Sequence, residues 1–169
     1  MPIKTNNYVK KTGDTMTGGL AGTTVSMSSM PRCRLYNSAA QTASSGSNLT
    51  LLWDTETYDV GSMHSTASNT SRITIPSDGY YFFHGHIAWV AGTADTWRLV
   101  RLYKNGATEI CSYYGLPSVN TKSFSVSITQ VVAAVAGDYF ELMAYQDTGG
   151  NLNVFGGSSN SNFTCFKLV

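Results

Sequence analysis

Two histidines hold the spacing in this chain that most resembles a chemical site. His84 and His86 stand two residues apart in a run of aromatic and β-branched residues, so a strand would place both imidazoles on one face. This spacing is compatible with metal ligation, but no cysteine or paired carboxylate accompanies it nearby. We therefore interpret the two histidines as core or interface residues, and we assign no metal ion and no cofactor.

Acidic and nucleophilic residues give no stronger indication of catalysis. Asp54, Glu56 and Asp59 could supply oxygen ligands for calcium, but their spacing matches no calcium loop and fits an ordinary solvated loop. The sequence contains no recognisable nucleophile elbow, phosphate-binding glycine loop or pair of catalytic carboxylates. The chain is therefore predicted not to be an enzyme.

Cysteines and loop tyrosines are the remaining candidates. Cys33, Cys111 and Cys165 are too few, and odd in number, for a disulfide framework, so we expect buried thiols. Three tyrosines on polar segments could stack on sugar rings at a surface; the alternative is that they only cap the fold. These possible surface contacts are Tyr58, Tyr113 and Tyr114.

The strand that carries the histidines dominates the expected architecture. Asp78-Gly79 is a turn signal, and the residues up to Val90 have the composition of a strand. One face should carry Tyr81, Phe83, Ile87 and Trp89, and the other Tyr80, Phe82, Ala88 and Val90 beside the histidines. A strand that is apolar on both faces is covered on both, which favours a facing sheet on one side and a second subunit on the other.

Other segments complete an all-β pattern. Asn105-Gly106 predicts a type I′ hairpin turn. The stretch 124–128 alternates apolar residues with serines, which predicts one dry and one wet face and a place in the outer sheet. Segments 138–145 and 162–169 are apolar on both faces, so we place them in the inner sheet with 75–90. Eight or so short strands without helical periodicity predict a two-sheet jelly-roll sandwich.

Composition limits the classes of partner. The chain has 169 residues, enough for one domain with a short appendage, and only 12% of them are charged. A net charge of +1 gives no electrostatic basis for binding nucleic acid or an anionic membrane. No apolar run approaches the roughly 20 residues that span a bilayer, and the N-terminus lacks the apolar core of a signal peptide. We expect synthesis in the cytoplasm and no membrane insertion.

Residues 1–31 differ from the rest and are predicted to form an extended N-terminal arm and linker. Their segment Lys10–Leu20 closely resembles the Gly-Asp-Thr-Met-Thr-Gly-x-Leu repeat of bacteriophage tail-fibre proteins, although it occurs here once. The resemblance implies attachment to a phage capsid or tail protein. The expected docking residues are Val9, Lys10, Lys11, Gly13, Asp14, Met16, Gly18 and Leu20.

Residues 32–169 carry a second resemblance. Segments 78–83, 136–142 and 163–168 are similar, in this order, to motifs in the globular head of complement component one-q and its relatives in the tumour necrosis factor superfamily. Cys165 stands where that family usually has glycine. The resemblance implies a jelly roll of about ten strands that forms a homotrimer through its inner sheet. With the two-faced strands, it predicts an interface of Tyr81, Phe83, Trp89, Tyr139, Met143, Tyr145, Phe163 and Phe166.

These features together predict a trimeric phage virion protein. The first hypothesis is a tail fibre or tail tip that adheres to a glycan or protein on the host surface. The alternative is a capsid-bound head fibre or decoration protein with a structural or weakly adhesive role. A depolymerase is the enzymatic alternative, but it lacks a catalytic constellation in this sequence.

Overall fold

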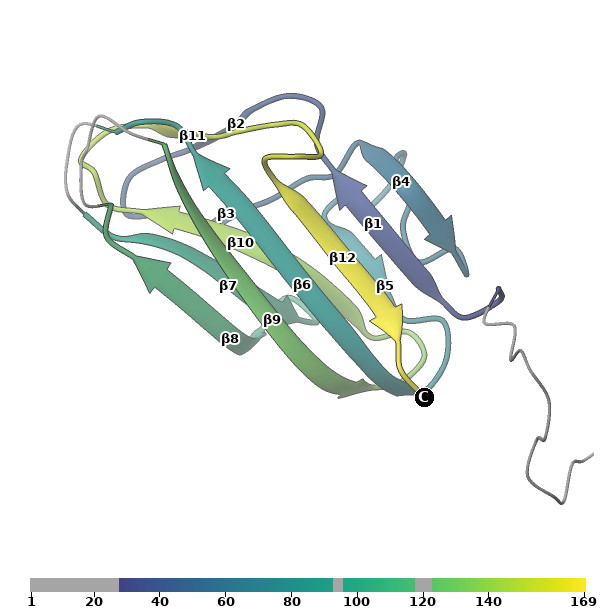
Figure 1. Ribbon diagram of the computed structural model, residues 1–169. Helices are drawn as coiled ribbons and strands as arrows, with labels where there is room; N and C mark the ends of the chain where they lie inside the picture. The colour runs from purple at the N-terminus through teal and green to yellow at the C-terminus, as the bar shows by residue number, and fades with distance from the viewer. Residues whose placement is uncertain (1–27, 93–95, 118–122) are drawn as a thin grey trace, which may run out of the picture.

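The computed structural model describes residues 28–92, 96–117 and 123–169, and its regular structure there is entirely β-strand (Figure 1). None of these ranges contains a helix that could cross a membrane. The strands are β1 Arg32–Tyr36, β2 Gln41–Ala43, β3 Leu49–Thr50, β4 Thr55–Val60, β5 Arg72–Thr74, β6 Gly79–Trp89, β7 Arg98–Lys104, β8 Thr108–Gly115, β9 Phe124–Ala134, β10 Tyr139–Gln146, β11 Leu152–Val154 and β12 Asn162–Lys167.

Two antiparallel sheets pack face to face. The seven-stranded sheet has the order β2-β11-β6-β12-β1-β4, with β9 also paired to β6. The five-stranded sheet has the order β3-β10-β7-β8, with β5 paired to β10. Figure 1 shows the two sheets as the layers of one sandwich. The predicted all-β jelly roll is confirmed.

Strand β6 lies inside the seven-stranded sheet and pairs with β9, β11 and β12. It pairs with β9 along its whole length and with β12 over six residues. Tyr81, Phe83 and Trp89 are fully buried towards the other sheet, as the alternation of side chains predicts. Gly85 has the same orientation, and a Cβ there would lie 2.6 Å from Leu142 Cδ1. The missing side chain therefore lets the opposite sheet approach closely.

Aromatic rings from both sheets meet in the core. The ring of Phe83 lies 4.3 Å from that of Phe140 on β10 and 6.1 Å from that of Phe163 on β12. Trp53 packs 6.0 Å from Phe163. Rings that interlock across the two layers remove a large apolar area from water, which is the main stabilising contribution in a sandwich of this kind.

The sheet membership of two strands differs from the sequence-based expectation. β9 has the predicted dry and wet faces, but it pairs with β6 in the seven-stranded sheet. β10, expected beside β6, lies in the opposite sheet between β3, β5 and β7. The prediction was wrong because it equated a strand that is apolar on both faces with the inner sheet. The apolar outward face of β10 is covered by side chains of its own chain.

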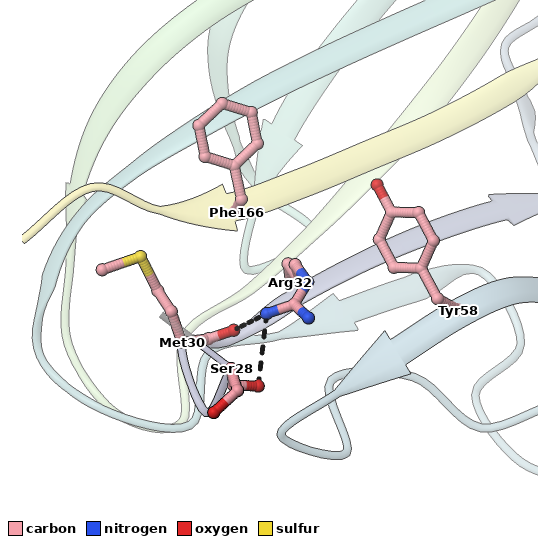
Figure 2. Close-up of a pocket in the computed structure, with 5 residues that line it drawn as sticks. All are labelled: Ser28, Met30, Arg32, Tyr58 and Phe166. Carbon is pink, nitrogen blue, oxygen red and sulfur yellow. Dashed lines mark hydrogen bonds between the residues drawn. The ribbon is translucent and has the colours of Figure 1, made fainter. Parts of the chain in front are cut away.

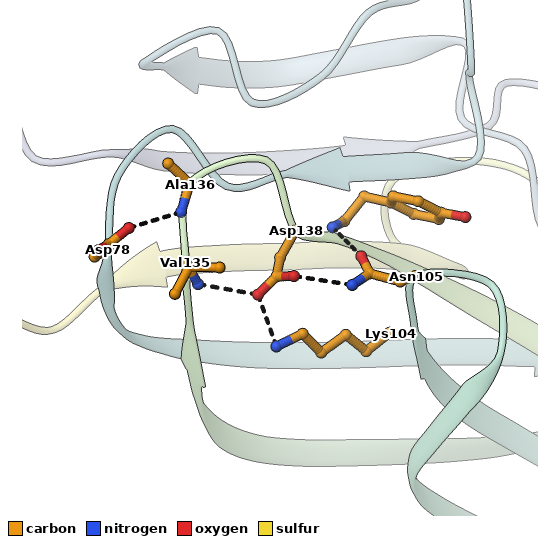
Figure 3. A network of polar contacts seen from close by, with 7 residues as sticks. Asp78, Lys104, Asn105, Val135, Ala136 and Asp138 are labelled. Carbon is orange, nitrogen blue, oxygen red and sulfur yellow. Dashed lines mark hydrogen bonds and ion pairs between the residues drawn. The ribbon is translucent and has the colours of Figure 1, made fainter.

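A polar network fastens the turns at one end of the sandwich (Figure 3). Asp138 accepts hydrogen bonds from Lys104 Nζ at 2.7 Å, Asn105 Nδ2 at 2.8 Å and the Val135 backbone N–H at 2.9 Å. Asn105 and Gly106 have φ values of 54° and 70°, which confirms the predicted type I′ turn. The network therefore ties the β7–β8 hairpin to the turn before β10.

Cys33 on β1 and Cys165 on β12 are register partners in neighbouring strands. Both are free thiols and fully buried, as predicted. Burial raises the pKa of both groups, so they remain protonated and act as small apolar side chains.

The proposed virion-docking residues, from Val9 to Leu20, lie outside the described residues. Their role, and the division of the chain at residue 31, stay predictions. The described chain enters β1 beside the exit from β12, where the Lys167 N–H donates to the Pro31 carbonyl at 2.9 Å. The C-terminal ends of β6, β8 and β10 lie at the opposite end of the sandwich, called the far end below (Figure 1).

Candidate functional site

The outward surface of the seven-stranded sheet is the candidate site. We call it the open face: it comprises the outward side chains of β1, β6, β9 and β12 with Tyr58 of β4. Tyr80 is 53% exposed and Val131 is 50% exposed, although both stand on a regular sheet next to other apolar side chains. Exposed apolar area that is contiguous on a flat sheet is typical of an interaction surface.

The half of the open face near the chain entry is aromatic. Phe82 and Phe166 are register partners, and their rings stack with centroids 4.6 Å apart. Beside them lies a cavity of about 370 Å³, lined by Ser28, Met30, Arg32, Tyr58 and Phe166. Figure 2 shows the rings of Phe166 and Tyr58 on either side of Arg32, whose guanidinium donates to the carbonyl oxygen of Met30 at 3.0 Å.

The half of the open face towards the far end is polar. His84 and His86 stand there, each partly buried between short side chains of the neighbouring strands. His84 Nδ1 lies 3.3 Å from Thr129 Oγ1, and His86 Nδ1 lies 2.7 Å from Ser127 Oγ. Burial, and next the nearby charge of His84, lower the pKa of His86 from its usual 6.5.

Most of the predicted interface residues are elsewhere. Four of them, Tyr81, Phe83, Trp89 and Phe163, are fully buried in the core of the single chain and offer no surface to a second subunit. Another three, Tyr139, Met143 and Tyr145, lie on the outward side of β10 in the five-stranded sheet. Of the eight, Phe166 alone belongs to the open face.

For the interface, sequence reasoning chose the side of β6 that the single chain buries, and it did not name Tyr80 and Phe82 on the open face. A signal was present, because these two share their face with the histidines. The opposite face is apolar apart from the hydroxyl of Tyr81, which donates to the Ser77 carbonyl at 2.8 Å. Ionisable side chains are seldom fully buried, so the face without them belongs to the core.

The outward surface of the five-stranded sheet, called the covered face, shields its own rings. The guanidinium of Arg72 lies 3.9 Å above the ring of Tyr139, and that of Arg101 lies 5.5 Å from the ring of Tyr145. Glu141 accepts a hydrogen bond from Ser71 Oγ at 2.6 Å and pairs with Arg72 at 3.6 Å. These contacts shield the aromatic side chains within the chain.

The three candidate surface tyrosines do not form one site. Tyr58 lies at the edge of the open face, whereas Tyr113 and Tyr114 project from opposite sides of β8. Tyr114 packs edge-on against Trp97, with centroids 4.6 Å apart and an interplanar angle of 80°. Both rings of this pair stay exposed, Trp97 at 42% and Tyr114 at 57%, at the far end. Trp97 was not among the predicted contacts.

Acidic residues near β4 have structural partners. Asp54 accepts hydrogen bonds from the backbone and side chain of Ser38, and Asp59 accepts from the backbone N–H groups of Met63 and His64. Within the described ranges, no three His, Cys, Asp or Glu side chains gather closely enough to hold a metal ion.

Comparison with known proteins finds similarity in structure only. No family model and no curated protein sequence matches this chain. Eiger TNF from S. frugiperda has a TM-score of 0.63 at 16% identity, covering 83% of this chain and 93% of that one. The globular domain of zebrafish complement 1qA has a TM-score of 0.59 at 16% identity, covering 82% and 98%. Murine APRIL at pH 5.0 has a TM-score of 0.62 at 11% identity, covering 82% and 99%.

These similarities confirm the jelly-roll fold expected from the motifs in residues 32–169. At such low identity a shared fold does not carry a shared function. The function must therefore be argued from the surfaces of this chain.

Proposed function

We propose that this chain is a non-enzymatic, trimeric bacteriophage virion protein that adheres to the host surface as part of a tail fibre or tail tip. The open face is the observation that supports the proposal best. It presents Tyr80 and Val131, both at least half exposed among the described residues, beside the stacked and partly buried rings of Phe82 and Phe166 on the outside of a regular sheet. A second and third copy would bury these rings.

The form of the open face suits a closed three-fold assembly. A head-to-tail contact uses two different patches on each copy and closes into a ring when the rotation is right. The cavity beside Arg32 and the protruding Tyr80 are two such unlike patches on one face. The resemblance to the tumour necrosis factor superfamily supports the choice of three copies.

The phage assignment rests on the single motif at Lys10–Leu20. The arm that carries it joins the jelly roll at Pro31, next to the end of β12. An attachment at that end directs the far end away from the particle. The protein would therefore present its far end to the surroundings.

The far end offers groups suited to a sugar. Trp97 and Tyr114 provide exposed aromatic surface, and aromatic side chains are enriched at recognition sites. On another part of this end is a cavity of about 390 Å³ with both polar and apolar walls. Its lining residues are Val90, Ala91, Gly92, Thr148, Gly150, Asn151, Leu152 and Asn153.

Truncation separates assembly from attachment. A variant that begins at Pro31 keeps every described strand, so light scattering should give the same trimer as the full chain. It should fail to join the phage particle, because the Lys10–Leu20 segment is absent. A monomer at micromolar concentration would refute the trimer, and equal incorporation of both forms would refute docking through the arm.

The alternative, a head fibre or decoration protein, is favoured by the single copy of the motif, since a fibre shaft would repeat it. Immunogold labelling of intact particles distinguishes a capsid position from a tail position. Binding of the purified trimer to host cells, compared with a Trp97→Ala variant, tests adhesion at the far end.

A further inference from the structure

The turn between β7 and β8 contains the only Asn-Gly pair of the sequence, Asn105-Gly106. An asparagine followed by glycine is the dipeptide most prone to lose its side-chain amide, because the next backbone nitrogen can attack the amide carbon and glycine hinders it least. Both residues are exposed, so water reaches them. The turn nevertheless requires glycine: Gly106 has a φ of 70°, and a Cβ there would lie 2.8 Å from the Tyr139 hydroxyl oxygen.

Three hydrogen bonds hold Asn105 against the beginning of β10 (Figure 3). Asn105 Nδ2 donates to Asp138 Oδ1 at 2.8 Å, and Asn105 Oδ1 accepts from the Tyr139 backbone N–H at 2.9 Å. The backbone N–H of Asn105 donates to the Tyr139 carbonyl oxygen at 2.9 Å. Attack by the Gly106 nitrogen would move the amide carbon and expel Nδ2, so both side-chain bonds must break before the reaction.

The carboxylate that holds the amide is itself fixed. Asp138 is buried, and its Oδ2 accepts from Lys104 Nζ at 2.7 Å and from the Val135 backbone N–H at 2.9 Å. A hydrogen bond to an ionised acceptor is stronger than one between neutral groups. The contact between Asn105 and Asp138 therefore restrains the reactive amide more firmly than a neutral acceptor would.

We propose that Asn105 is a deamidation site that the Asp138 network keeps closed in the folded protein, and that deamidation there releases the β7–β8 hairpin from the turn before β10. The Gly106 nitrogen bonds to Asn105 Cγ and loses its proton, and Nδ2 leaves as ammonia, which gives a succinimide. Water then opens the ring at either carbonyl carbon, to aspartate or to isoaspartate. Water is the one co-reactant, and the site needs one chain only, so it does not depend on the proposed virion function.

The product would turn an attractive contact into a repulsive one. The asparagine amide donates to Asp138, whereas an ionised aspartate side chain can only accept. Two carboxylates at hydrogen-bond distance cannot both ionise without a large cost. Isoaspartate also adds a methylene to the main chain, which distorts the tight turn. Deamidation would therefore prevent the network from closing again after it has opened.

The test follows deamidation of Asn105 in the full-length protein by peptide mass spectrometry in neutral buffer. We expect the folded protein to react at least about 10-fold more slowly than the same protein unfolded in guanidinium chloride. Asp138→Ala should react about 10- to 100-fold faster than wild type, because it removes a hydrogen bond to a charged group. Lys104→Met is the matched control: it removes a partner of Asp138 and keeps the acceptor of Asn105, so its rate should rise by no more than about 5-fold.

Equal rates in the folded and unfolded wild-type protein would overturn the proposal, because the network would then give no protection. Equal acceleration in Asp138→Ala and Lys104→Met would also overturn it, because general loss of stability would explain the reaction.

A second comparison applies if Asp138→Ala folds poorly. Asn105→Asp introduces one product of deamidation directly, so it should unfold at a lower urea concentration than wild type, and the β7–β8 amides should exchange hydrogen faster. Asn151→Asp adds the same charge at an exposed position at the far end and should behave like wild type. Identical unfolding and exchange in the two variants would contradict the proposed release of the hairpin.

Discussion

On the covered face, Arg72 lies 3.9 Å above the ring of Tyr139 and Glu141 is 8% exposed, so cations and carboxylates of the same chain enclose the aromatic side chains. On the open face, Phe82 and Phe166 stack on each other, and Tyr80 projects with 53% of its surface exposed. Both faces belong to strands that are apolar on two sides. Aromatic content therefore does not distinguish the two faces; among the described residues, the cover by charged side chains of the same chain does.

The largest difference between the faces should appear when a charge is placed on each. Val131→Asp would bury a carboxylate in the proposed trimer interface, opposite its register partner Phe82, which costs about 3–5 kcal/mol. That corresponds to a loss of at least about 100-fold in association. Analytical ultracentrifugation should show monomers for this variant.

Met143→Asp is the matched change on the covered face. Met143 lies beside Arg101 in the register of β10 and β7, so the new carboxylate would have a cationic neighbour. This variant should remain trimeric. Dissociation of Met143→Asp with an intact Val131→Asp trimer would reverse the assignment of the two faces.

A smaller effect is expected from removing the cover itself. Arg72→Ala would expose the Tyr139 ring. It would also remove the ion pair of the buried Glu141 and leave that carboxylate the hydrogen bond from Ser71. Together these losses should lower the free energy of unfolding by about 1–3 kcal/mol. Arg101→Ala is the control, because its pair with Glu109 is more exposed and should contribute below about 1 kcal/mol. Urea titration measures both, and equal losses would contradict the proposed role of Arg72.

The smallest effects should appear in how the stability of the fold depends on pH, because His86 in one sheet and Asp138 at the start of the other titrate in different pH ranges. The pKa of His86 is lowered from 6.5, so the unfolded chain gains this proton first and stability declines as pH falls below about 6.5. Burial alone would raise the pKa of Asp138, but hydrogen bonds from Lys104, Asn105 and Val135 lower it from 3.8 to about 2, so its contribution is lost only between about pH 4 and pH 2.

Urea titrations across this range should show two separate declines. His86→Gln should remove the decline in mild acid and retain the one in strong acid. A variant that loses neither would mean that the histidine does not respond differently in the folded and unfolded chain.

Side-chain alternation could be predicted from the sequence, and so could the turn at Asn105-Gly106, because both depend on local geometry. Sheet membership could not. A two-residue period records whether each face of a strand is wet or dry, and it does not say which strand lies alongside. For this reason, β9 and β10 each lie in the sheet where the other was expected.

The candidate site was predictable only in part. Phe166 and the shared face of His84 and His86 follow from the sequence. The shielding of Tyr139 by Arg72 does not, because the two residues meet through pairing of β5 with β10, far apart in the chain. The hydroxyls that fix the imidazoles likewise come from the register of β9, which no local pattern specifies.

The buried thiols of Cys33 and Cys165 allow the opening of the β1–β12 strand pair to be measured as a rate. A protonated thiol without solvent contact does not react with alkylating reagents, so modification requires these two strands to separate first. Cys111 is only partly buried and should be labelled earlier. The labelling rates of the three cysteines, followed by mass spectrometry, would thus time the opening of this strand pair relative to the β7–β8 hairpin.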